Sequence, residues 1–280
     1  MIAGTRRTRG VGGPAGARWV ERAARLGHVA TGAVYLILGG VALTAIFDVR
    51  IRPMGSQGAL HVALTGPIGR LLLLAIAVGL TLDFVWQIVR AVKNVDATPR
   101  TLKGFADRAG WAVSGAVHLG LAITAAKLAF AVPQESAERA TKERTALIVG
   151  LPVGRWLIVM AAFVIVLVGL HLIRRAWIGD VDRWLDLRSL PRLNRVVILV
   201  LGRLGLAARG VVFGAGGLLL GWAALQNRPW DARGVGGTLR ALQSMPLGSA
   251  LLAAVAIGLI GFGVVELASA RYRRIAIRPP

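Results

Sequence analysis

Five polar or charged residues stand inside long apolar stretches of the sequence, and their types could support ion pairing or a path through a membrane. They are Asp83, Gln87, His118, Arg209 and Glu266. Ionisable side chains are costly in hydrocarbon, so each one suggests a function by default. Arg209 and Glu266 are expected at similar depths, where a guanidinium and a carboxylate would satisfy each other. Their pair could clamp two helices or form part of an ion or substrate path, and the sequence favours the clamp.

The other three candidates differ in the partners that the sequence offers them. Asp83 precedes Gln87 by one helical turn, so both lie on the same helix face. The expected partners of Asp83 are basic residues at the inner membrane boundary, namely Arg25, Arg90 or Arg108. His118 lies near the middle of its stretch with no second histidine expected at that depth, which argues against a haem held by two imidazoles.

Patterns typical of enzymes are absent from the sequence. The chain has no cysteine, which excludes disulfides and thiolate metal sites. It contains no HExxH motif, no Walker glycine loop and no nucleophile elbow. The glycine-rich GVGG at 234–237 follows no expected strand and is interpreted as a flexible turn. We therefore expect no enzymatic activity, no cofactor and no metal.

The elements that must position these residues are transmembrane helices. The chain is 55% apolar with a mean hydropathy of +0.65, and about 20 apolar residues suffice to cross a bilayer as a helix. Because the alternating pattern of a β-barrel is absent, we expect an all-α, polytopic bundle of six transmembrane helices. The six stretches are roughly 26–47, 67–90, 109–131, 152–173, 204–225 and 246–270.

The distribution of charge predicts how the chain is oriented. The sequence has 34 Lys and Arg against 13 Asp and Glu, a net charge of +21. Most basic residues fall in the N-terminal segment, the second and fourth loops and the C-terminus. We expect the protein to lie in the inner (plasma) membrane, and the positive-inside rule then predicts that both termini are cytoplasmic. This surface would attract anionic lipid headgroups. Topology thus accounts for the charge, and we expect no nucleic-acid binding. Residues 1–19 are expected to be a disordered tail, followed by an uncleaved first helix.

Two short patterns each occur three times. The pattern R-x-G-x-x-x-x-G-x-V-[YHF] opens the odd-numbered stretches, and its first three fixed residues are Arg25, Gly27 and Gly32, then Arg108, Gly110 and Gly115, then Arg203, Gly205 and Gly210. The pattern P-x-G opens the even-numbered stretches at Pro67, Pro152 and Pro246. We expect the glycines to let helices approach closely, the arginines to anchor helix ends at the headgroups, and each proline to occupy the first helical position.

These patterns predict three tandem two-helix repeats in parallel orientation, arranged as a pseudo-three-fold ring. Their expected ranges are 20–92, 104–177 and 198–271. A short semi-apolar segment before each proline (ALHVALTG, RTALIVGL, TLRALQSM) is expected to form an interfacial half-turn or helix. Alignment of the repeats predicts one polar contact inside each repeat, pairing Thr31 with Gln87, Ser114 with Leu172, and Arg209 with Glu266.

The two patterns and the triplicated layout resemble the bacterial membrane family known as domain of unknown function 1206. The resemblance covers about residues 20 to 271 and rests on the placement of glycine, arginine and proline. It implies the three-repeat membrane fold and carries no activity or catalytic residues. Two functions stay open: a structural or interaction protein (a scaffold or accessory subunit) and a small-solute or ion transporter with a cavity on the pseudo-three-fold axis. The sequence favours the first, because few polar residues are expected near the midplane.

Overall fold

The computed structural model describes residues 14–48, 52–64, 66–93, 101–133, 136–179, 185 and 190–272. Within these residues the chain is all-helical. Of the tail predicted to be disordered, residues 1–13 lie outside the described part, and Pro14 already begins a helix.

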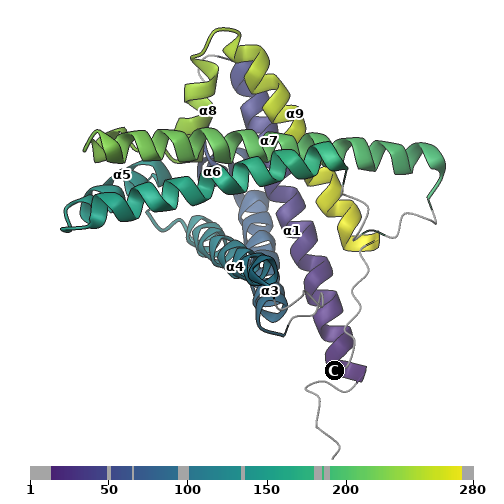
Figure 1. Ribbon diagram of the computed structural model, residues 1–280. Coiled ribbons are helices and arrows are strands. Elements are labelled where there is room, and N and C mark those ends of the chain that lie inside the picture. The colour runs from purple at the N-terminus through teal and green to yellow at the C-terminus, as the bar shows by residue number, and fades with distance from the viewer. Residues whose placement is uncertain are drawn as a thin grey trace, which may run out of the picture.

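Six long helices form the body of the molecule (Figure 1). They are α1 (Pro14–Phe47), α3 (Gly66–Lys93), α4 (Leu102–Ala129), α6 (Gly154–Ile178), α7 (Arg192–Leu225) and α9 (Gly248–Tyr272). All six are long and apolar enough to cross a membrane. The prediction of an all-α fold with six membrane-spanning segments is therefore confirmed, and the chain has the makeup of a multi-pass membrane protein.

Three short helices stand where the sequence predicted short interfacial elements. They are α2 (Ser56–Ala63), α5 (Ala137–Val149) and α8 (Val235–Gln243), and a 3₁₀ turn at Pro229–Asp231 precedes α8. The interpretation of 234–237 as a flexible turn is wrong, because Val235 begins α8 and both Gly236 and Gly237 are buried. The backbone N–H of Gly237 donates to Glu138 of α5 at 3.0 Å, and Arg240 pairs with the same carboxylate at 3.2 Å.

The three P-x-G prolines do not share one helical position. Pro67 is the second residue of α3, whereas Pro152 and Pro246 lie in turns just before α6 and α9. The glycine of the pattern has the same role in all three repeats, because it lies against a carbonyl group at the end of the preceding short helix. A Cβ on Gly69 would lie 2.5 Å from the carbonyl carbon of Leu64, at the end of the preceding short helix. Only glycine fits so close to a carbonyl group.

The closest helix pairs join neighbouring repeats. α3 packs on α4, α6 on α7, and α9 on α1, so each repeat packs on the other two. We call these three inter-repeat contacts the ring, which is interrupted between α4 and α6, because these two helices do not pack on each other. The second glycine of the R-x-G-x-x-x-x-G pattern lies at the centre of each pair. The packed residues are Gly32 with Gly263 and Leu267, Gly115 with Phe84 and Gln87, and Gly210 with Gly169 and Ile173. Phe84, Gly169 and Gly263 occupy equivalent positions when the repeats are aligned on their arginine and proline, so the three pairs use one packing scheme.

Contacts inside a repeat are formed in the first and third repeats. A Cβ on Gly27 of α1 would lie 2.7 Å from Cβ of Asp83 on α3, and a Cβ on Gly205 of α7 would lie 2.7 Å from Cβ of Phe262 on α9. These two glycines are equivalent, and so are the residues that they meet. The corresponding Gly110 of α4 has no atom within 4 Å of such a Cβ. We call these three intra-repeat interfaces seams: α1/α3 and α7/α9 are closed, and α4/α6 is open.

In the first and second repeats, the arginine of the repeat pattern caps a helix of a neighbouring repeat. Arg25 donates to the carbonyl oxygens of Ala270 (2.6 Å) and Arg271 (2.9 Å) at the end of α9. Arg108 donates in the same way to the end of α3, at Ala91 (2.6 Å) and Val92 (3.2 Å). The last carbonyl groups of a helix lack partners within it and carry partial negative charge, so a guanidinium stabilises them. This role was not predicted from the sequence; anchoring at headgroups stays a prediction.

In Figure 1, the α6–α7 pair crosses the α1–α9 pair. The parallel orientation of the three repeats, and the side of the membrane on which the termini lie, stay predictions.

Candidate functional site

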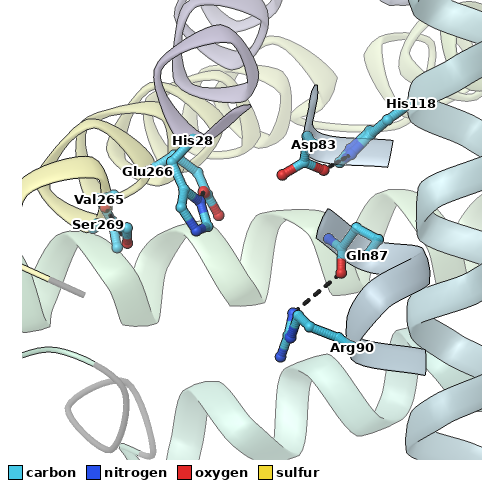
Figure 2. Close-up of polar contacts among 8 residues, drawn as sticks. All are labelled: His28, Asp83, Gln87, Arg90, His118, Val265, Glu266 and Ser269. Carbon is cyan, nitrogen blue, oxygen red and sulfur yellow. Dashed lines mark hydrogen bonds and ion pairs between the residues drawn. The ribbon is translucent and has the colours of Figure 1, made fainter. Parts of the chain in front are cut away.

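The first part of the site is a buried contact between α3 and α4. Asp83 is 1% exposed, and its Oδ2 lies 2.5 Å from Nδ1 of His118. Glycine at position 27 lets α1 pass directly over the backbone of Asp83. The carboxylate is therefore enclosed by helices on two sides and satisfied by an imidazole from the second repeat (Figure 2).

The second part is a similar contact between α1 and α9. Nδ1 of His28 lies 2.7 Å from Oε2 of Glu266, and both side chains are largely buried. His28 follows Gly27, whose added Cβ would lie 2.7 Å from Cβ of Asp83, so α1 brings the two carboxylate–histidine pairs close together (Figure 2). Each pair joins helices from two different repeats. Together the pairs connect α1, α3, α4 and α9.

Gln87 and Arg90 continue the polar region along α3. Nη1 of Arg90 donates to Oε1 of Gln87 at 3.1 Å (Figure 2). The guanidinium lies 4.3 Å from the centre of the Trp111 ring of α4 and 6.0 Å from that of Trp86. Arg90 is buried, and the indole faces provide part of the stabilisation that water would otherwise give.

Arg209 enters the same interior from α7. Its Cζ lies 4.5 Å from the ring centre of Phe262, 5.3 Å from that of Tyr35 and 5.7 Å from that of Phe213. These rings come from α9, α1 and α7. Nε of Arg209 is buried and has no hydrogen-bond partner among the described residues. The cation is thus held mainly against aromatic faces.

The chain can now be placed among known proteins. Residues 26–94, 109–179 and 204–273 each match the model of Domain of Unknown Function (DUF1206). The chain belongs to this family. An uncharacterized protein of Bacillus subtilis (strain 168), YxxB, is 29% identical over 266 residues, which cover 92% of each chain. No solved structure matches the chain. The three matched segments confirm that the DUF1206 unit is a two-helix repeat used three times.

Alignment of the DUF1206 repeats shows that the polar pairs replace apolar ones. The position of Asp83 and His118 at α3/α4 corresponds to Phe262 and Tyr35 at α9/α1, whose ring centres are 4.7 Å apart. The position of His28 and Glu266 corresponds to Leu206 and Leu172 at α7/α6, which belong to one buried cluster. The same packing position is therefore ionisable in one copy of the DUF1206 repeat and apolar in another.

Two predicted pairings are wrong. Glu266 contacts His28, and Arg209 lies among aromatic rings, so no ion pair between Arg209 and Glu266 is found among the described residues. Thr31 makes no hydrogen bond to Gln87, because its buried hydroxyl has no hydrogen-bond partner among the described residues. Both predictions assumed polar contacts inside a DUF1206 repeat. Glu266 instead pairs with His28 of the first repeat, and Arg209 lies against the rings of Phe262 in its own repeat and Tyr35 in the first.

The predictions for Asp83 and His118 also need correction. The partner of Asp83 is His118 and not Arg25, Arg90 or Arg108. The statement that His118 has no partner at its depth considered only a second histidine, and a carboxylate fills that place. One signal in the sequence could have revealed this. The last position of the repeat pattern is Tyr35, His118 or Phe213, and a histidine at a position that is otherwise aromatic indicates a polar partner on the adjacent helix.

The chemistry open to this site is the exchange of protons. Among the described residues no group of three or more His, Cys, Asp and Glu side chains is placed to hold a metal ion. A carboxylate that accepts from Nδ1 orients the imidazole and leaves Nε2 as the basic atom of the neutral ring. Two carboxylate–histidine pairs lie in the interior of this DUF1206 protein.

Proposed function

We propose that this protein is a non-catalytic interaction protein of the cell membrane, a scaffold or accessory subunit that binds one transmembrane helix of a partner protein at the open seam. The observation that carries this proposal is the difference between the α4/α6 seam and its two closed equivalents. Both termini would lie in the cytoplasm, with the basic surface on anionic lipid headgroups.

The exposed side chains of the open seam are those that the other repeats bury. Val113 of α4 is 65% exposed, whereas the equivalent Ala30 and Ala208 are 5% and 4% exposed. Val164 of α6 is 52% exposed, whereas the equivalent Gly79 and Gly258 are buried. The face that packs on a helix in two repeats is thus left without a helix in the third.

The residues themselves explain why the seam stays open. In the closed seams a glycine of the even helix lies on an alanine of the odd helix, as in the contact of Gly258 with Ala208. In the second repeat both positions are valine, Val113 and Val164. Two branched side chains cannot pass at the distance that glycine and alanine allow, because interior packing leaves no room for the extra methyl groups.

A helix is the occupant that this face fits. Its equivalents are each covered by one antiparallel apolar helix, and Gly110 and Gly120 of α4 have free space beside them. Small residues of this kind allow close helix packing in lipid, where apolar contact alone gives little preference over acyl chains. A partner helix could therefore gain contacts here that lipid tails do not supply.

Site-specific photo-crosslinking in intact membranes tests the proposal. A photoreactive residue at Val117, which is 63% exposed on the open face, should give one defined protein adduct, and the same residue at Val78 of α3, 61% exposed, should not. The adduct should be identified by mass spectrometry as a membrane-spanning protein and should disappear in the Val113→Ala/Val164→Gly variant. Labelling of lipid alone at both positions would refute the proposal.

A transporter for a small solute or ion is the second candidate. It is favoured by the two buried carboxylate–histidine pairs, because ionisable groups inside spans often mark transport paths. Purified protein in liposomes, assayed for proton and cation flux with entrapped dyes, tests it. Flux that is lost in Asp83→Asn would support transport, and no flux above that of empty liposomes would exclude it for these ions.

A further inference from the structure

We propose that the two carboxylate–histidine pairs, Asp83–His118 and His28–Glu266, form one proton-binding site inside the helix bundle. This inference does not depend on the open seam or on its partner. It rests on the contacts of the pairs, on their closeness to each other, and on the comparison with equivalent apolar positions.

Packing does not require ionisable groups at these positions. Tyr35 and Phe262 fill the position of His118 and Asp83 at another interface of the same ring, and Leu172 lies with Leu206 in one cluster at the position of Glu266 and His28. A buried ion pair is often no more stabilising than apolar residues of similar volume. The chain therefore bears the cost of burying two acids and two imidazoles where it elsewhere uses apolar side chains, which indicates a role beyond holding helices together.

The geometry gives the proton a defined place. With the Nδ1–H of His118 donating to Asp83, Nε2 is the ring atom that accepts a proton. The His118 side chain is 15% exposed, whereas that of Asp83 is 2% exposed. A proton thus enters at the imidazole and is stabilised by the enclosed carboxylate. Only an N–H bond forms, and the ring becomes an imidazolium beside a carboxylate.

The two pairs meet at the α1/α3 seam. A Cβ on Gly27 of α1 would lie 2.7 Å from Cβ of Asp83, and the next residue of α1 is His28, whose Nδ1 lies 2.7 Å from Glu266. Protonation of one imidazole therefore changes the cost of protonating the other. The charged groups facing this interior are His28 from α1, Asp83 and Arg90 from α3, His118 from α4, Arg209 from α7 and Glu266 from α9.

Proton uptake by the full chain in lipid nanodiscs tests the inference. Uptake between pH 8 and pH 5 is measured directly, and ¹⁵N NMR of the histidine rings assigns it. One variant, Asp83→Phe/His118→Tyr, copies the Phe262–Tyr35 pair, and another, His28→Leu/Glu266→Leu, copies the Leu206–Leu172 pair. His61→Gln, in the outer helix α2, serves as the control for an unrelated histidine.

Each double variant should lose the proton uptake of its own pair. It should also shift the titration midpoint of the histidine in the other pair by about one pH unit. His61→Gln should leave both midpoints unchanged. If either double variant fails to fold, Asp83→Asn removes the carboxylate at constant shape and should shift the midpoint of His28 in the same way. Unchanged uptake in the variants, or a remaining pair that titrates at an unchanged pH, would overturn the proposal of one shared site.

Discussion

The second repeat and its two counterparts show how few side chains decide whether two membrane helices close on each other. In the first and third repeats, alanine on the odd helix meets glycine on the even helix, and the seam is closed. In the second repeat, Val113 and Val164 occupy these positions and remain exposed. The three interfaces between repeats, by contrast, are all closed around the same glycine position.

This difference distinguishes the interfaces between repeats from the seams inside them. The inter-repeat pairs form the ring and tolerate varied residues, from Gly263 to Phe84, opposite their glycine. The seams vary in whether they close at all. We infer that the ring is the common framework of the repeats and that the seams are where individual copies diverge.

The largest effect is expected at Asp83, which lies both in a closed seam and in a polar pair. Asp83→Ala leaves His118 without its carboxylate and opens space under Gly27, so we expect a loss of about 3–5 kcal/mol in the free energy of unfolding. The equivalent Val168→Ala, on the open seam, should cost less than about 1 kcal/mol, because Val168 is 44% exposed. Reversible unfolding in detergent micelles measures both. Equal losses would contradict the distinction between the seams.

A smaller effect is expected from a single methyl group. Gly205→Ala places a Cβ 2.7 Å from Cβ of Phe262, so α7 and α9 must separate, at a cost of about 1–3 kcal/mol. Gly110→Ala is the matched control, because no atom lies within 4 Å of its new Cβ. It should be neutral or slightly stabilising, since alanine is the better helix former. Thermal unfolding of both variants in nanodiscs provides the comparison, which fails if Gly110→Ala is the more harmful.

Much of this fold could be predicted from the sequence. The length and apolarity of the six stretches specify the long helices, and the triplicated arginine, glycine and proline specify the repeats. The close-packing role of Gly27 and Gly32 followed from their small size. Which helix each glycine meets could not be derived, because the pattern is compatible with partners inside the repeat and with partners in the next one.

The site was harder to predict than the fold. Asp83, His118 and Glu266 were identified because polar side chains in apolar stretches stand out, but their partners were not. Depth along a helix can be estimated from sequence position, whereas the direction in which a side chain points depends on tertiary packing. His28 was not among the residues selected from the sequence, although it is 4% exposed and pairs with Glu266.

The open seam should close when its residues are made like those of the other repeats. Val113→Ala/Val164→Gly restores the alanine–glycine contact, so α4 and α6 should pack as α7 and α9 do. Because the chain has no native cysteine, a single cysteine at position 117 reports the change. Its labelling by a membrane-permeant maleimide should fall several-fold in the closed variant, and cysteine at position 78 should be labelled equally in both backgrounds. Unchanged labelling at position 117 would show that something other than these two valines keeps the seam open.

The smallest effect concerns the helix caps. Arg108→Gln removes two hydrogen bonds to the end of α3 and a cation from the negative end of that helix, so unfolding should be easier by about 0.5–1 kcal/mol. The equivalent Arg203 lies beside Gly179 after the end of α6, but it makes no hydrogen bond to the carbonyl groups there among the described residues. Arg203→Gln should therefore change the unfolding midpoint less than Arg108→Gln. If the two substitutions had equal effects, the arginines would act through the lipid headgroups, as the sequence suggested, and not through the helix ends.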